Sequence, residues 1–345
     1  MAAPSTAITR LDLSMGYGEF SLAANRAKYI GLRVLPPLGV SQEAADFAKI
    51  VVEQLLTKIE DTRRAPKSGY ARDDWTWTTD SYAVQEHGVE EIVDDATVER
   101  YGDVVRAELV SANRAINRVL QRLEYDIATA CETSGNNGAS TAASPAAWTT
   151  PATADPIADV DAAHERLELA CGEDGNTLQM TRKAFRAMIR TDRLESLLKY
   201  DASELLVALS QGTQQNMVSE IMSGLKDLLQ VDTILVARGF SNTADRGQSA
   251  SFSRVWDDTK AHLFVARDDG MDGDLENPMP QWGRVIFSTK NDEPLPGLMD
   301  GGLGSLIIDE YREESVRGSV LRPRNKRQVK ILHPECSQQI TGVTA

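Results

Sequence analysis

The nearest approach to a metalloprotease motif in this chain begins at His164 and Glu165. Two histidines four residues apart on one helix face would clamp a zinc ion, and the glutamate would act as general base. The closing position holds Glu168 instead of a histidine. The sequence therefore predicts no zinc clamp here, and a solvated helix face is the favoured interpretation.

Other chemistry-bearing patterns are incomplete as well. A calcium-like run offers Asp268, Asp272 and Glu276, but Gly270 and Met279 occupy positions that require oxygen ligands. No phosphate-binding loop and no hydrolase elbow occurs in the sequence. We therefore expect no catalytic residue, no metal site and no cofactor.

The histidines and cysteines are too widely spaced to form ligand sets. They are His87, His164, His262 and His333, with Cys131, Cys171 and Cys336. An odd number of cysteines without a Cys-x-x-Cys pair gives no disulfide framework, so three buried or free thiols are expected. An α+β enzyme with an unrecognised site remains an alternative, and it would require a convergent cluster of acid, base or nucleophile.

The charge balance is acidic, with 37 Lys plus Arg against 51 Asp plus Glu and a formal net charge of −14. This balance disfavours nonspecific binding of the whole protein to DNA or to anionic membranes. One basic run is the exception, and it contains Arg322, Arg324, Lys326 and Arg327. The run is a candidate contact to DNA or to an acidic partner, although a solvated loop before a strand is the favoured interpretation.

The size and apolar content are those of a globular protein. With 345 residues, of which 41% are hydrophobic, the chain can bury a sizeable core and divide into two or more lobes. No apolar run is long enough to cross a bilayer, and the N-terminal residues lack the apolar core of a signal peptide. We therefore expect synthesis in the cytoplasm and no membrane partner.

The longest regular pattern extends from residue 96 to residue 131. Apolar residues recur there at every third or fourth position from Val98 to Ile127, and no proline interrupts them. This period predicts one continuous helix of about 50 Å, at 1.5 Å per residue. A helix of that length would act as a strut.

The segments around this helix predict extended and loop structure. Residues 25–40 contain two consecutive prolines, which favour an extended strap outside the core. Residues 60–82 alternate Trp75 and Trp77 with threonines, as is typical of a long hairpin with both indoles on one face. Residues 133–156 are rich in small residues, which indicates a mobile hinge between lobes.

Beyond this hinge, the apolar runs predict alternating helices and strands, as in an α+β lobe. Helices are expected at residues 157–171, 182–190, 195–200 and 217–229, and strands at 177–180, 233–237, 262–266, 285–288, 307–316 and 328–332.

The parts follow one another in a particular order. A Leu-Pro-Pro segment, a charged hairpin, a strut helix and a small-residue linker precede an Asp-Pro-Ile helix start at Asp155 and the run from Gly175 to Thr181. Further points are Trp148, Asn242-Thr243-Ala244, Val255-Trp256 and the segment from Tyr311 to Ser315. In this order, over about residues 20–345, the chain resembles the major capsid proteins of tailed double-stranded DNA bacteriophages, which have the Hong Kong 97-type fold.

The resemblance implies an α+β, Hong Kong 97-like capsid fold and a structural protein without enzymatic activity. In chain order, the implied parts are an N-terminal arm at 1–48, an E-loop region at 49–92, a peripheral domain with a spine helix at 93–145, an axial domain at 146–300, and strands returning to the peripheral domain at 301–345. The implied E-loop residues at a subunit interface are Arg63, Arg64, Lys67, Arg72, Trp75 and Trp77.

The implied function is self-assembly into pentamers and hexamers of an icosahedral phage head that encloses double-stranded DNA. The implied partners are other copies of the chain, a separate scaffolding protein, a portal, a candidate decoration protein, and packaged DNA bound without sequence specificity. Assembly is expected in the host cytoplasm and the final location is the virion capsid. An encapsulin-like shell of a non-viral compartment, which would enclose an enzyme, remains the alternative.

Overall fold

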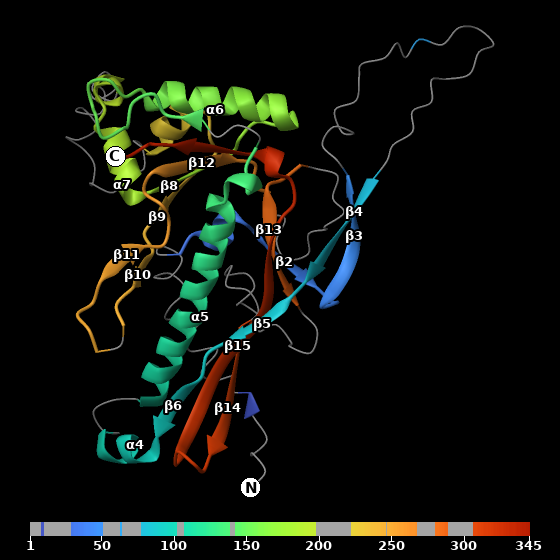
Figure 1. Cartoon of the computed structure of the whole chain (residues 1–345), viewed down its shortest axis with the longest axis vertical. Coiled ribbons are helices and arrows are strands. Elements are labelled where there is room, and N and C mark those ends of the chain that lie inside the picture. The colour runs from blue at the N-terminus through green and yellow to red at the C-terminus, as the bar shows by residue number, and fades with distance from the viewer. Residues whose placement is uncertain are drawn as a thin grey trace, which may run out of the picture.

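The fold is α+β, with two main sheets that are connected by one long helix (Figure 1). The computed structural model describes residues 8–9, 29–50, 63, 77–101, 107–138, 142–197, 222–245, 247–267, 280–288 and 306–345. The seven-stranded sheet has the order β1 (Ile8–Thr9), β14 (Ile307–Glu313), β15 (Gly318–Ile331), β13 (Gly283–Ser288) and β2 (Pro37–Val40), and β15 also pairs with β5 (Gln85–Gly88) and β6 (Glu91–Asp94). The five-stranded sheet has the order β7 (Ala142–Ala143), β16 (Ser337–Thr341), β12 (Lys260–Phe264), β8 (Thr177–Thr181) and β9 (Thr233–Ala237).

Two-stranded ribbons and helices complete the described structure. The ribbons are β3 (Ala44–Ile50) with β4 (Trp77–Ala83), and β10 (Phe240–Asn242) with β11 (Phe252–Arg254). The helices are α2 (Gly31–Val34), α4 (Asp95–Tyr101), α5 (Ala107–Glu132), α6 (Pro156–Cys171) and α7 (Arg182–Ile189), with the short 3-10 helices η1 (Ser134–Asn136) and η2 (Pro334–Cys336). Residues 192–197 and 222–228 are also helical.

The apolar stripe predicted for the long helix is confirmed over α5. Its first half packs with β6, β14 and β15 in one cluster, which contains Val93, Ala112, Ile116, Val119, Leu120, Leu306, Ile308 and Leu321. Its second half places Leu123 and Ile127 in the larger core around the five-stranded sheet. Because one helix face enters both clusters, α5 fixes the two sheets relative to each other.

The expectation of one continuous helix from residue 96 is wrong. The described part of this segment forms two helices, and α4 lies at an angle to α5 (Figure 1). The start of α4 is fixed by the β14–β15 hairpin, because the Asp95 N–H donates to the Arg317 carbonyl (3.1 Å) and its carboxylate accepts from Arg312 (2.7 Å). Val98 is consequently exposed and lies outside the buried stripe. The 26 residues of α5 give a strut of about 39 Å.

The segment that was expected to be a strap is part of the core. Ile30, Val34, Leu35 and Leu38 are each at most 2% exposed. Residues 31–34 form one helical turn, and β2 then pairs in parallel with β13. Four large apolar side chains within nine residues stabilise the fold through burial, and this contribution outweighs the preference of the prolines for an extended surface strand.

The expectation of a mobile linker is wrong for the described part of residues 142–156. The Trp148 side chain is fully buried, and its indole nitrogen donates to the Asp159 carboxylate (2.8 Å). The Trp148 N–H also donates to the Val343 carbonyl (2.8 Å), and β7 pairs with β16. A large aromatic residue within a small-residue segment therefore attaches the segment to the core.

The elements predicted beyond the linker are confirmed where the structure describes them, whereas residues 198–200 and 217–221 of two predicted helices lie outside the described residues. α6 begins where the Asp155 carboxylate accepts from the Ala158 N–H (3.3 Å), and it ends at Gly172, whose φ is +68°. Strand β9 has the predicted bounds, while β15 is longer than the predicted strand at 328–332. α6 packs across β12 and β16, on one face of the five-stranded sheet (Figure 1).

Candidate assembly surfaces

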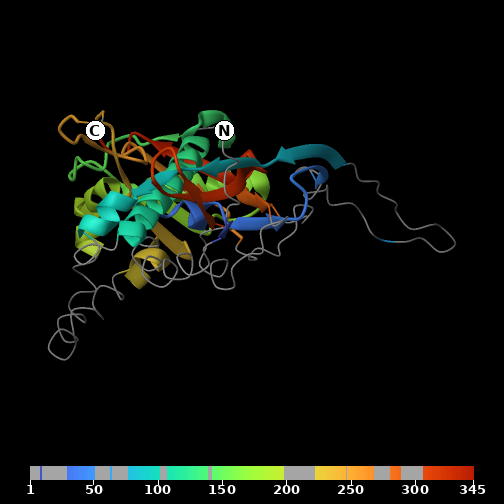
Figure 2. The same cartoon turned by 90° about the horizontal axis from the view of Figure 1, so that it is seen from below.

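The β3–β4 hairpin projects from the body of the molecule, as the view from below shows (Figure 2). The two strands pair from Ala44 opposite Ala83 at the body to Ile50 opposite Trp77 at the outer end. Because alternate residues of a strand point to opposite faces, Trp77 shares its face with Thr79 and Ser81. All three are exposed, and 58% of the Trp77 surface is accessible.

The opposite face of this hairpin is attached to the seven-stranded sheet. Phe47 and Tyr82 are buried in a small cluster with Ile286 and Leu332. Their rings lie 6.4 Å apart, which is within the range of favourable aromatic contacts. The hairpin therefore has an apolar anchor at its base, whereas its outer end has an exposed tryptophan.

Polar contacts add to this anchor. The Lys330 ammonium lies 2.6 Å from Asp80 Oδ1, and the Ala83 N–H donates to Gln328 Oε1 (2.7 Å). Burial raises the pKa of the Asp80 carboxyl, but the hydrogen bonds from Lys330 and from the Ser81 N–H outweigh burial, so the pKa lies below its usual value. The ionised pair therefore joins β4 to β15.

The hairpin residues proposed for the interface are only partly placed by the structure. Arg63 is exposed, and Trp77 is exposed at the outer end of β4. The remaining members lie outside the described residues, and they are Arg64, Lys67, Arg72 and Trp75. Their role at an interface stays a prediction.

The basic run near the C-terminus belongs to β15, so the expectation of a solvated loop is wrong. Alternation along β15 turns Arg322, Arg324 and Lys326 to one face and Arg327 to the other. Asp309 accepts from Arg324 (2.7 Å) and Arg322 (3.4 Å), and Glu43 accepts from Lys326 (2.5 Å). These pairings neutralise much of the local positive charge. Arg327 is 1% exposed and pairs with Asp126 of α5 (3.1 Å).

A buried carboxylate in α5 was missed by the sequence patterns. Glu124 is 2% exposed and accepts from the N–H groups of Ile30 (3.1 Å) and Gly31 (2.7 Å), and from the Trp256 indole (2.6 Å). Burial raises the pKa of Glu124, and the three hydrogen bonds oppose that shift. An acidic residue three positions before Ile127, on the apolar face of the helix, was the available signal.

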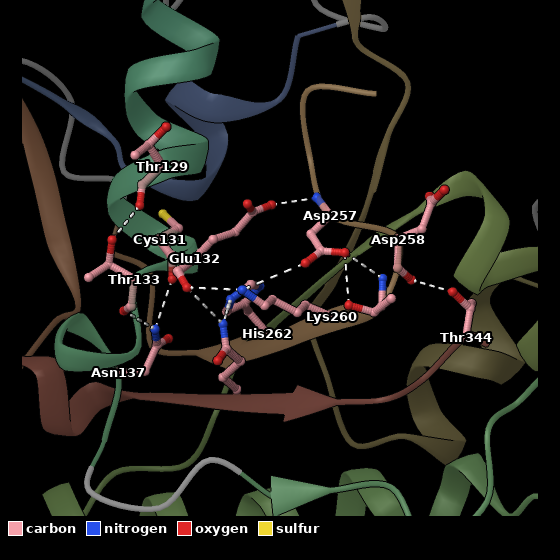
Figure 3. A network of polar contacts seen from close by, with 12 residues as sticks. Thr129, Cys131, Glu132, Thr133, Asn137, Asp257, Asp258, Lys260, His262 and Thr344 are labelled. Carbon is pink, nitrogen blue, oxygen red and sulfur yellow. Dashed lines mark hydrogen bonds and ion pairs between the residues drawn. The ribbon is translucent and has the colours of Figure 1, made fainter. Parts of the chain in front are cut away.

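A second polar network connects the end of α5 to the five-stranded sheet (Figure 3). The Asp257 N–H donates to Glu132 Oε1 (2.5 Å), and the Lys260 ammonium donates to the Glu132 carbonyl (3.2 Å). His262 lies between Gln179 (2.9 Å) and Gln339 (3.0 Å), on the neighbouring strands β8 and β16. Burial, together with the charge of Lys260, lowers the pKa of His262 to about 3.

His164 is buried rather than solvated, which corrects the sequence interpretation. Its Nδ1 contacts the Asp174 carboxylate, and its Nε2 lies 3.0 Å from the Leu229 carbonyl. The three cysteines are buried free thiols, as expected. Within the described residues, no group of three His, Cys, Asp or Glu side chains could hold a metal ion. None of the helices in the described part of the chain is long and apolar enough to span a membrane.

The comparison with solved structures identifies the fold. A phage-related protein from Bordetella bronchiseptica aligns with a TM-score of 0.66 and 18% identity, over 98% of both chains. A virus-like particle protein from Pyrococcus furiosus aligns with a TM-score of 0.51 and 13% identity, over 96% of both chains. A prophage protein from Escherichia coli that is assigned as a capsid protein aligns with a TM-score of 0.51 and 13% identity, over 98% of this chain and 99% of its own.

No protein-family model and no curated protein sequence matches the chain. The structural matches extend over nearly the whole length of both partners, so the likeness belongs to the complete fold rather than to one lobe. The chain has the α+β fold of phage capsid proteins, the Hong Kong 97 type. The fold class expected from the sequence is confirmed.

Proposed function

We propose that this chain is a capsid-type shell protein: the major capsid protein of a tailed phage, which self-assembles into the pentamers and hexamers of an icosahedral head around double-stranded DNA. Its role is structural and non-enzymatic. The fold of phage capsid proteins over 98% of this chain supports the proposal.

The observation that carries the proposal is the projecting β3–β4 hairpin. An isolated two-stranded ribbon is marginally stable in water, and exposed edges and aromatic side chains favour association. Trp77 is 58% exposed at the outer end of this ribbon. A neighbouring copy would cover it, and such head-to-tail contacts close into rings.

The division into parts belongs to the same proposal. Residues 1–48 would be the N-terminal arm, 49–92 the E-loop, 93–145 the peripheral domain, 146–300 the axial domain, and 301–345 the returning strands. The E-loop would contact the adjacent subunit through its basic residues and both tryptophans. The first strand of the hairpin, β3 (Ala44–Ile50), spans the boundary between the proposed arm and the proposed E-loop.

The partners follow from the proposed shell. They are other copies of the chain, a separate scaffolding protein, a portal and a decoration protein, with assembly in the host cytoplasm and a final place in the virion. Packaged DNA would touch the shell without sequence specificity. The ion pairs of Arg322, Arg324 and Lys326 with acidic side chains favour a weak contact.

A virus-like particle protein from Pyrococcus furiosus shares the fold, and the fold alone does not determine what a shell encloses. A compartment shell that encloses a protein cargo is therefore the second candidate. The content of purified particles separates the two functions. A phage head, expressed with its neighbouring genes, yields particles whose DNA resists nuclease. A compartment shell yields particles with a co-purifying protein and no protected DNA. A chain that remains monomeric at high concentration with scaffold supplied would contradict both.

A further inference from the structure

An open cavity of about 280 Å³ lies between α5 and the paired strands β5 and β15, beside the base of the β3–β4 hairpin. Figure 1 shows β5 next to β15, where the chain leaves β4. The lining residues are Ala83, Gln85, His87, Asp126, Arg327, Gln328 and Val329. Most of the polar side chains among them can donate hydrogen bonds.

The strongest feature of this cavity is a buried donor without an acceptor. Arg327 donates through Nη1 to Asn325 Oδ1 (2.9 Å) and through Nη2 to Asp126 Oδ2 (3.1 Å). Its Nε is buried and has no hydrogen-bond partner among the described residues, and the same is true of Asn325 Nδ2. Buried donors in folded proteins are nearly always satisfied. The two nitrogens therefore indicate an acceptor that the described residues do not supply.

The charge around the cavity is positive despite the presence of a carboxylate. Asp126 accepts from Arg122 Nε (2.8 Å) as well as from Arg327, so two guanidinium groups share one carboxylate. Burial lowers the pKa of His87, and the charges of Arg327 and Arg122 lower it further, against the opposite effect of Asp126. The environment of His87 therefore has an excess of positive charge that an anion would neutralise.

The strand register turns two further donors to the same face. Gln85 lies directly opposite Arg327, and His87 lies directly opposite Asn325. Directly opposite residues of an antiparallel pair share one face, so the Gln85 amide and the His87 ring stand beside Arg327. Gln85 is exposed at the rim, where a ligand would enter.

We propose that this cavity binds a small oxyanion, either a phosphate-like ion or a carboxylate group, with Arg327 as the central donor and Gln85 and His87 at the rim. Two sources share this chemistry: free phosphate in solution, and a carboxylate of a second copy of the chain. The bound anion would brace the junction of β4 and β5 against α5, and so stiffen the base of the projecting hairpin. The cavity is formed within one chain, so the binding of free phosphate would not depend on shell assembly.

Isothermal titration of the dispersed full-length chain with inorganic phosphate, and separately with acetate, tests the site. Sodium chloride at equal ionic strength is the blank. We expect saturable binding at one site per chain. Gln85→Glu places a carboxylate opposite Arg327 and should weaken phosphate binding about tenfold. Gln248→Glu is the matched control on the exposed loop after β10, and it should bind like the wild type.

The two sources give different results in assembled particles. If phosphate is the natural ligand, it binds dispersed and assembled chains alike. If a second copy supplies the carboxylate, phosphate binds dispersed chains and is excluded from particles. His87→Gln, which leaves buried Arg327 in place, should also weaken binding. The absence of saturable binding by both anions would overturn the proposal, as would an unchanged affinity in Gln85→Glu.

Discussion

The Trp256 indole nitrogen donates to Glu124 Oε1 over 2.6 Å, and this buried hydrogen bond joins the middle of α5 to the loop between β11 and β12. The same carboxylate accepts from the N–H groups of Ile30 and Gly31 at the start of α2. One side chain thus connects three segments that are far apart in the sequence. Removing one partner of a buried charge-assisted network is costly, because the remaining groups stay buried without partners.

We expect Glu124→Gln to lower the free energy of unfolding by about 1–3 kcal/mol. Both carboxylate oxygens of Glu124 accept from N–H groups, so the NH₂ group of a glutamine would face at least one other hydrogen-bond donor. Urea denaturation of the dispersed chain measures this loss. Glu165→Gln, on the exposed face of α6, is the control and should change stability by less than about 0.5 kcal/mol. Equal effects of the two substitutions would contradict a structural role of Glu124.

The pH dependence of stability should reflect His262. Its neutral ring donates from Nδ1 to Gln179 and accepts at Nε2 from Gln339, so a second proton would face an amide donor. The pKa falls from 6.5 to about 3 on folding. The contribution of His262 to the free energy of unfolding is therefore fully present above pH 6.5. This contribution is lost as the pH falls toward 3, because the histidine of the unfolded chain binds the proton first.

The expected slope is up to about 1.4 kcal/mol per pH unit for each such histidine. His333, whose pKa burial lowers to about 4, adds to the same loss. Chemical denaturation at a series of pH values measures the slope. His262→Gln should flatten it between pH 6 and 4, and a variant with the wild-type slope would show that His262 does not titrate on unfolding.

Replacing Trp75 and Trp77 together by alanine should leave the circular dichroism and solubility of the dispersed chain near normal, because Trp77 is 58% exposed. Shell yield and shell melting temperature should fall, since tryptophans at interface centres commonly contribute about 2–4 kcal/mol. Thr79→Ala, on the same exposed face of β4, is the control. Unaltered shells would remove the interface role, whereas an unfolded monomer would show that the indoles stabilise the subunit itself.

Trp148 should protect residues 142–156 from proteases. Limited proteolysis with mass spectrometry should find no early cut in this segment of the wild-type chain, and an early cut there in Trp148→Ala. The substitution should also lower the unfolding free energy by about 3–5 kcal/mol, since the side chain is fully buried. Rapid cleavage of the wild-type segment would support a mobile linker instead.

The sequence patterns predicted elements well where local periodicity and capping coincide. The α6 helix has Asp155 before it and Gly172 after it, and α5 has an apolar stripe, so both were expected. The angle between α4 and α5 was not expected, because apolar spacing continues through both helices and gives no information on their relative direction. The attachment of β6 to β15, which sets that direction, is a long-range contact.

The same limit applies to the candidate surfaces. Alternation along a strand predicts which residues share the face of Trp77, whereas the exposure of this face is seen only in the structure. The burial of Arg327, however, depends on Asp126 of a helix 201 positions away, and no local pattern indicates it. The basic run was therefore interpreted as a loop, although its alternation of charged and uncharged residues also fits a strand with one buried face.

The central claim is that this chain forms a shell in which each β3–β4 hairpin lies on a neighbouring copy. Electron cryomicroscopy of particles assembled from the purified chain, with scaffold supplied, tests it most directly. We predict closed shells built from rings of five and six subunits, with the hairpin of each subunit extended over the adjacent subunit and Trp77 covered. Particles in which every hairpin folds back on its own subunit, or a chain that stays monomeric, would contradict the claim.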